Sequence, residues 1–269
     1  MRGNGRRPSP VVDWGTIRHY AHYSLPVLRQ WGAQVSSLRE ITTTDVEAVL
    51  ETVTGHRAHA LHSSLRSLFR ALKRERVIFR DPARGVSVTY VASAPRRIPS
   101  DRLIGLIDRA PTAMAKAVVA LTAIHALGPT EIARLQFTDL NRSKGRMTVR
   151  RNYGPDTLYL DELTTKLLAN WLRERFERWP RSTNPHLFVT QQTSLDPTGP
   201  PLAKFTLRPL FLNLGIQPRQ LRIDRILDEA HETADPVHLM RGFGISDTTA
   251  MKYVKAAHPH RFTKDPTRA

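Results

Sequence analysis

The spacing of hydrophobic residues predicts that most of the chain folds into helices. The clearest helix runs from about Arg57 to Arg76, because apolar residues recur there on one face at helical spacing. A second apolar stripe, between Leu160 and Phe176, is typical of a helix that buries one face in a core. That stripe consists of Leu160, Leu163, Leu167, Leu168, Trp171, Leu172 and Phe176. Further helices are expected at 103–107, 113–124 and 130–135, and near Lys204, Pro218, Pro236 and Ser246.

One segment departs from the helical pattern and predicts a small sheet. The segments 145–149 and 158–160 have strand character, and Gly154-Pro155-Asp156 between them is typical of a turn. The expected fold class is therefore mainly α, with one small antiparallel β-sheet in the second half of the chain.

Proline-containing segments divide the chain into two helical parts. Arg80-Asp81-Pro82 ends the first part, because proline cannot continue a helix and restrains the residue before it. The run VASAPRRIPS, with two prolines and two arginines, is the best candidate for a linker. We expect a flexible basic arm at 1–12, a helical domain at 13–90, a linker at 91–99, a mostly helical domain at 100–260 and a tail at 261–269.

The charge balance points to a polyanionic partner. The 269 residues include 41 Lys plus Arg against 24 Asp plus Glu, which gives a formal net charge of +17 and a pI of about 11.0. Codon usage can explain why only eight of the basic residues are lysine, but it does not explain the excess of positive charge. Release of counterions from nucleic acid is the usual way in which such a field gains affinity. We therefore expect double-stranded DNA as the partner.

A basic face on the 57–76 helix is a candidate DNA contact. Arg66, Arg70 and Lys73 fall at i, i+4 and i+7, where like charges repel unless an anion lies across them. A solvated basic face is the plain alternative. The start of the chain, MRGNGRRPSP, can likewise contact phosphates or remain solvated.

Several classes of protein are disfavoured. The chain has no cysteine, and its most apolar stretch, 115–127, is too short to span a bilayer and contains Lys116 and His125. No apolar segment follows the basic start, so we expect a cytoplasmic, nucleoid-associated protein without membrane contact. His56, His59 and His62 lack a carboxylate at metal-ligand spacing, and no phosphate-binding glycine loop is present. We expect neither a metal nor a small-molecule cofactor.

Five segments follow one another in an informative order. They are LRSLFRALKRERVIFRDPARGV (65–86), ALGPTEIARLQFTDL (126–140), the hairpin at 145–160, RQLR (219–222) and GFGISDTTAMKYV (242–254). In this order they resemble the tyrosine recombinase (phage integrase) family over about residues 13–259. The first is similar to the end of that family's core-binding domain, and the second to its first catalytic box. The last three are similar to its lysine-bearing hairpin, its H-x-L-R motif and its tyrosine box.

The resemblance implies a site for DNA strand cleavage and rejoining. Tyr253 matches the nucleophile that attacks a scissile phosphate, Arg222 matches the second catalytic arginine, and Glu131 matches the acid of the first box. Arg219 stands where the family has the histidine of H-x-L-R. The family's two domains form a clamp on duplex DNA, and a homo-oligomer on DNA is expected. Residues expected to face the duplex are Arg66, Arg70, Lys73, Arg150, Arg151, Arg219, Arg222 and Lys252.

Four positions depart from the family pattern, and Arg219 in place of the H-x-L-R histidine is one of them. Gly128 aligns with the first catalytic arginine, and Gly244, or Phe243 if one gap is allowed, aligns with the histidine of the tyrosine box. Arg150 or Arg151 replaces the hairpin lysine, and arginine cannot act as an acid or base near neutral pH. Two alternatives therefore remain open. One is an active site-specific recombinase; the other is an inactive DNA-binding protein of the same fold that regulates or maintains a mobile element.

The final segment also matches a helix-turn-helix. In this interpretation residues 236–254 form two helices joined by a Gly-Ile-Ser turn, with Ser246 as the N-cap of the recognition helix. Tyr253 is then a packing aromatic or a phosphate contact. The arginines that would clamp phosphates in this alternative are Arg219, Arg222, Arg225 and Arg241.

Overall fold

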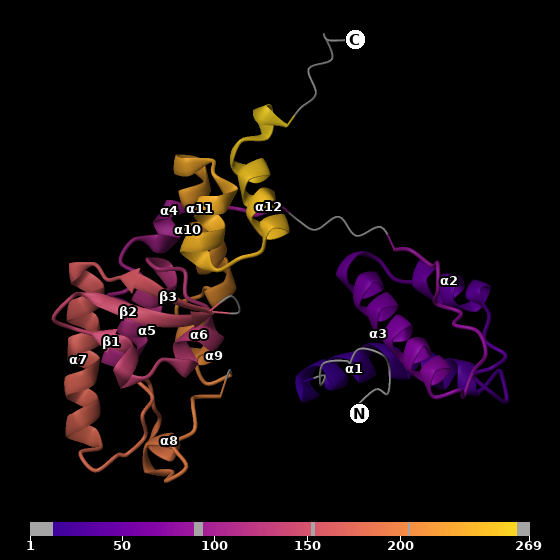
Figure 1. Cartoon of the computed structure of the whole chain (residues 1–269), viewed down its shortest axis with the longest axis horizontal. Coiled ribbons are helices and arrows are strands. Elements are labelled where there is room, and N and C mark those ends of the chain that lie inside the picture. The colour runs from indigo at the N-terminus through magenta and orange to yellow at the C-terminus, as the bar shows by residue number, and fades with distance from the viewer. Residues whose placement is uncertain (1–12, 89–93, 152–153, 204, 263–269) are drawn as a thin grey trace. The chain divides into compact units, whose positions relative to one another are not determined.

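The computed structural model describes residues 13–88, 94–151, 154–203 and 205–262. The chain separates into two compact units, 1–93 and 94–269, and the division falls inside the segment expected to be a linker. The expected basic arm at 1–12 and residues 263–269 of the expected tail lie outside the described residues. Figure 1 labels the elements of both units, and each unit is described by itself.

The first unit is a small helical bundle. Its helices are α1 (Trp14–Gly32), α2 (Thr43–Glu51) and α3 (Gly55–Arg74). The α3 helix buries the predicted apolar face, with Leu65 and Phe69 fully buried and Phe69 packed against Trp31 of α1. Thr42 and Asp45 form a capping box that fixes the start of α2, because each side chain accepts a hydrogen bond from the backbone N–H of the other.

The second unit is mainly helical and contains the sheet. Its elements are α4 (Ser100–Leu103), α5 (Ala113–Ala123), α6 (Pro129–Arg134), η1 (Phe137–Asp139), β1 (Leu140–Asn141), β2 (Arg146–Arg151), β3 (Gly154–Tyr159), α7 (Glu162–Arg178), α8 (Gln191–Leu195), α9 (Arg208–Leu212), α10 (Pro218–Thr233), α11 (Pro236–Phe243), α12 (Asp247–Ala257) and η2 (Pro259–Arg261). The mainly α fold class with a small antiparallel sheet is confirmed. No helix in the described ranges has both the length and the apolar character that a membrane span needs.

The sheet is antiparallel with strand order β1-β2-β3, and its turn differs from the prediction. Gly154, Pro155 and Asp156 belong to β3, where they pair with Arg151, Arg150 and Val149. The expected turn at these residues is therefore wrong. Pro155 is tolerated because β3 is an edge strand, where a missing backbone N–H costs little.

Three other predictions of local structure need correction. The helix expected at 103–107 ends at Leu103, and Gly105 has a positive φ of 63° that a helix does not accommodate. The helix expected near Lys204 starts at Arg208, while Lys204 itself lies outside the described residues. In the α7 stripe, Leu163 and Phe176 are about half exposed, because that stripe is wider than the face that packs on the core.

Two apolar clusters position the rest of the unit. The larger one joins α5, α6, α7 and the sheet, and includes the stacked rings of Trp171 and Phe188. The smaller one lies among α10, α11 and α12 and includes Leu239, Phe243 and Tyr253. Figure 1 shows these three helices packed together as one group. The helices of the 236–254 prediction are confirmed, and Ser246 caps α12 by accepting a hydrogen bond from the Thr249 backbone N–H.

Candidate functional site

Glu131 in α6 is the centre of a charged network. Its Oε2 accepts a 2.6 Å hydrogen bond from the backbone N–H of Gly128, which caps the start of the helix. The same oxygen lies 3.5 Å from Nη1 of Arg222, and Oε1 lies 3.4 Å from Nε of Arg151. One carboxylate therefore fixes two guanidinium groups, one from α10 and one from β2.

Arg222 is held from two sides. Its Nη2 donates a 3.0 Å hydrogen bond to the carbonyl of Phe243 at the end of α11, in addition to its ion pair with Glu131. Gly128 leaves the space that the guanidinium uses, because a Cβ there would lie 2.9 Å from Nη1 of Arg222. The Arg222 side chain keeps 28% of its surface exposed, so an anion can reach it.

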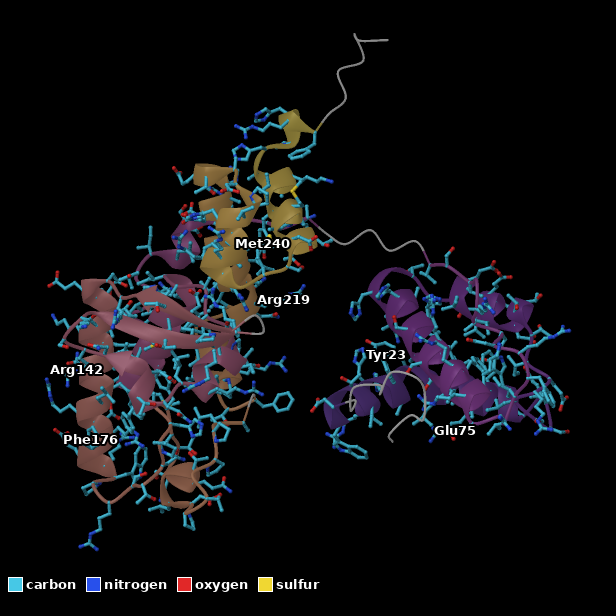
Figure 2. All side chains as sticks on the ribbon, in the orientation of Figure 1. Tyr23, Glu75, Arg142, Phe176, Arg219 and Met240 are labelled. Atoms are coloured by element: carbon cyan, nitrogen blue, oxygen red, sulfur yellow. The ribbon has the colours of Figure 1, made fainter. Side chains whose placement is uncertain are left out.

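Tyr253 lies on the inner face of α12, and its charge environment is set by two arginines. The residue is 7% exposed and packs in the cluster of α10, α11 and α12. Burial raises the pKa of the Tyr253 phenol, while the positive charges of Arg222 and Arg219 act to lower that pKa. The structure therefore brings Tyr253, Arg219 and Arg222 close enough to interact electrostatically, although they come from two helices. Figure 2 labels Arg219 at the N-terminal end of α10.

Arg151 does not face the solvent, which corrects the expectation that it contacts a duplex. Its side chain is 5% exposed, and its Nη1 donates to Asp156 Oδ2 at 2.8 Å and to the Gly242 carbonyl at 2.9 Å. The same nitrogen donates to the Arg241 carbonyl at 3.2 Å. Arg151 can take this buried position because residue 244 is a glycine: a Cβ there would lie 2.3 Å from Cδ of Arg151. Unpaired carbonyls at the end of α11 also favour a cation.

The other predicted contacts fall into two groups. Arg150 and Arg225 are engaged by acidic side chains: Nη1 of Arg150 lies 2.6 Å from Asp139 Oδ2, and Nη2 of Arg225 lies 2.7 Å from Glu229 Oε2. Residues without a carboxylate partner in the described part of the chain are Arg66, Arg70 and Lys73 of α3, Arg219 of α10, Arg241 of α11 and Lys252 of α12. Lys252 is half-buried and the other five are exposed.

Comparison with solved structures identifies the fold, whereas no protein-family model and no curated protein sequence matches the chain. The Tn1549 transposon integrase in complex with transposon right-end DNA is similar at a TM-score of 0.68 and 12% identity, with 95% of this chain and 96% of that chain covered. XerH recombinase bound to a palindromic difH substrate is similar at a TM-score of 0.68 and 17% identity, with 91% and 77% covered. A lambda integrase dimer bound to a COC′ core site is similar at 0.66 and 14%, with 97% and 92% covered.

This chain has the tyrosine recombinase fold. The similarity spans both units of the chain, and at these identities it establishes architecture rather than activity. Within the recombinase fold, the residues that matched the first box, the RQLR motif and the tyrosine box come together around Glu131, Arg222 and Tyr253.

The second unit also contains a pocket that sequence reasoning missed. It has a volume of about 440 Å³ and lies among α6, α9, the loops before α9 and α10, and the start of α10. Its lining residues are Gly128, Pro129, Thr130, Phe205, Arg208, Leu212, Ile216, Gln217, Pro218, Arg219 and Arg222. Two segments far apart in sequence, 128–130 and 205–222, form the pocket, so no local pattern signals it. The high exposure of Phe205 also follows only from tertiary structure.

The described residues contain no group of three or more His, Cys, Asp or Glu side chains that could hold a metal ion. Of the three clustered histidines, His62 is engaged with the backbone, since its Nε2 lies 3.0 Å from the Val86 carbonyl oxygen. The side chains that the structure brings together at the site are those of Glu131, Arg151, Arg222 and Tyr253.

Proposed function

We propose that this protein binds duplex DNA and cleaves one strand through Tyr253, with Arg222 and Arg219 holding the phosphate. The observation that carries the proposal is the electrostatic proximity of the Tyr253 phenol to these two arginines within a recombinase fold. The solved structures of similar fold include integrases and recombinases in complex with DNA. The net charge of +17 supplies the attraction for such a partner.

The reaction requires a bond exchange at one phosphorus. The phenol oxygen of Tyr253 attacks the phosphate, the bond between phosphorus and the 5′ oxygen breaks, and the strand remains joined to the protein by a 3′-phosphotyrosyl link. The phenol proton passes to solvent, and the leaving 5′ oxygen takes up a proton to become a hydroxyl. Negative charge grows on the phosphate oxygens in the transition state, and the two guanidinium groups stabilise that charge. Rejoining is the same exchange in reverse.

Glu131 acts through Arg222 in this scheme. Its ion pair and the Phe243 carbonyl leave the Arg222 guanidinium little freedom to rotate, so the group is positioned before DNA arrives. Burial raises the pKa of the Tyr253 phenol, and the charges of Arg222 and Arg219 act to lower that pKa, so the same two arginines favour loss of the phenol proton during attack.

A second function, DNA binding without cleavage, is favoured by one observation. Arg151, in the hairpin that carries the family's lysine, is buried and held by Glu131, Asp156 and two carbonyls, so it cannot donate a proton to the leaving oxygen. In this alternative the protein regulates or maintains a mobile element through its bound DNA. The use of α11 and α12 as a helix-turn-helix stays a prediction.

The proposal assigns a DNA-binding role to both units. The 13–90 unit serves as the core-binding domain, with Arg66, Arg70 and Lys73 toward phosphates, and the 100–260 unit carries the cleavage site. Assembly of several copies on DNA and association with the nucleoid in the cytoplasm belong to the same proposal.

Trapping of a covalent complex tests the proposal. A randomised duplex library is first enriched for bound sequences, and the enriched duplex is rebuilt with bridging 5′-phosphorothiolates. These linkages leave a thiol that does not re-ligate well and that needs no general acid. The expected result is a protein–DNA adduct on a denaturing gel, lost in Tyr253→Phe and retained in the control Tyr159→Phe, whose ring is 74% exposed on β3.

The possible results separate the two functions. An adduct with phosphorothiolate DNA but not with ordinary DNA establishes Tyr253 as a nucleophile in a site that has no general acid to protonate the leaving 5′ oxygen. Tight binding without any adduct supports the non-cleaving protein, and absence of binding to all enriched DNA contradicts both.

A further inference from the structure

The pocket beside the Tyr253 site has an apolar wall that faces solvent. Phe205 is 78% exposed and Leu212 is 54% exposed, whereas Leu207 and Phe211 of the same segment are fully buried in the core. The segment therefore divides its apolar residues between the core and the pocket. The exposed Phe205 ring and Leu212 side chain gain free energy when a flat apolar group covers them.

The pocket is also cationic. Arg208, Arg219 and Arg222 line the pocket, where α10 begins at Pro218. No carboxylate is among the lining residues; Glu131 contacts Arg222 from outside the pocket. Such a surface favours an anion, and two of its arginines, Arg219 and Arg222, are the ones whose charges act on the Tyr253 phenol.

An anion joined to a flat apolar group is the chemistry of a nucleotide. A volume of about 440 Å³ exceeds that of a lone phosphate and leaves space for a sugar and a base. A base inside a duplex has both faces covered by its neighbours, so it cannot present a face to Phe205. Only an unpaired or extruded base can stack on the ring.

We infer that this pocket binds an unpaired nucleotide, with its phosphate on Arg219 and Arg222 and its base against Phe205. The inference rests on the proposed function, because the phosphate of that nucleotide is the one that Tyr253 would attack. The protein then prefers DNA in which one nucleotide has left the helix. Stacking of one base on an aromatic side chain changes affinity by about 5- to 150-fold.

Paired binding measurements test the inference. Two fluorescein-labelled duplexes of the same enriched sequence are compared by anisotropy at fixed salt, one fully paired and one with a single unpaired thymidine. We expect the full-length protein to bind the bulged duplex at least fivefold more tightly. Phe205→Ala should abolish the preference and leave affinity for the paired duplex within about twofold. Phe79→Ala is the matched control, because Phe79 is 83% exposed and lies in the first unit.

Each other outcome has one meaning. Equal affinity of the wild-type protein for the two duplexes overturns the nucleotide pocket and leaves the proposed DNA binding intact. A preference that persists in Phe205→Ala shows that the protein recognises bending at the bulge rather than the base, and also overturns it. Failure to bind either duplex contradicts the proposed function itself.

Discussion

At the scale of single residues, the site depends on positions that have no side chain. Gly128 leaves room for the Arg222 guanidinium, and Gly244 leaves room for the methylenes of Arg151. These are the two positions where the family pattern has an arginine and a histidine. Arg151 of the hairpin occupies the space beside Gly244, and its guanidinium binds Glu131. Arg151 and Gly244 are therefore complementary, and restoring a family residue at 244 requires Arg151 to move.

Substitution of Gly244 by alanine should destabilise the protein by about 1–3 kcal/mol. Two causes contribute: the positive φ of 59°, and the 2.3 Å approach of a Cβ to Arg151. Denaturant unfolding measures the loss, and the double variant Gly244→Ala/Arg151→Ala should cost less than the sum of the single variants. Gly215→Ala is the control, since Gly215 has a φ of 67° with no atom within 4 Å, so it should show only backbone strain and no coupling to Arg151. Additive losses at 244 and 151 would contradict the packing.

At the same scale, buried His125 makes stability depend on pH. Its Nε2 lies 2.9 Å from Asp161 Oδ2, and burial lowers the His125 pKa more than the Asp161 charge raises it. Below pH 6.5 the unfolded chain takes up a proton that the folded protein resists, so stability is lost as pH falls toward the folded pKa. His125→Gln should therefore reduce the decline in unfolding free energy between pH 7 and 5.5. The slope that remains belongs to His186 and His231, whose pKa values burial also lowers. An unchanged slope would show that folding does not lower the His125 pKa.

At the scale of elements, α7 carries a fully buried arginine. Nη2 of Arg175 donates to the Asn184 carbonyl at 2.9 Å, its guanidinium lies 4.4 Å from the Phe137 ring centroid, and its Nε has no hydrogen-bond partner. No carboxylate pairs with it in the described ranges, and burial lowers its pKa. A charge in this position is costly, and an apolar side chain of similar length avoids that cost.

Arg175→Met should accordingly leave stability within about 1 kcal/mol of the wild type or raise it. Arg175→Ala should lower stability by about 2–4 kcal/mol, because it leaves a cavity beside Phe137. Urea unfolding of the two variants distinguishes the effect of removing the buried charge from the effect of removing side-chain volume. A large loss in Arg175→Met would mean that the guanidinium stabilises the fold through its cation–π contact and its hydrogen bond.

Elements were predictable from the sequence where their signal is local. The periodicity of α3, the α11–α12 pair with its Ser246 cap, and the existence of the hairpin all follow from neighbouring residues. The buried orientation of the Arg151 side chain was not predictable, because it depends on backbone carbonyls about 90 residues away in the sequence. The pocket was missed for the same reason, since α6, α9 and α10 meet only in the folded unit.

At the scale of the whole molecule, the positive charge should make DNA binding strongly dependent on salt. Each phosphate contact adds about 0.9 to the slope of log affinity against log salt. The triple variant Arg66→Gln/Arg70→Gln/Lys73→Gln should lower that slope by about 2–3 if the α3 face contacts the duplex. The control Arg142→Gln/Lys144→Gln, exposed near the β1–β2 turn, should change it by less than about 1. Equal effects of the two variants would show that α3 is merely a solvated basic face.

The most direct test of the whole account is peptide mapping of the trapped complex. The protein is incubated with the enriched phosphorothiolate duplex, digested with nuclease and protease, and analysed by mass spectrometry. The account predicts a nucleotide joined through phosphate to the peptide that contains Tyr253, in an amount that Arg222→Ala reduces by at least about 10³-fold. A nucleotide on another tyrosine, or protein that binds this DNA tightly and carries no nucleotide, would contradict it.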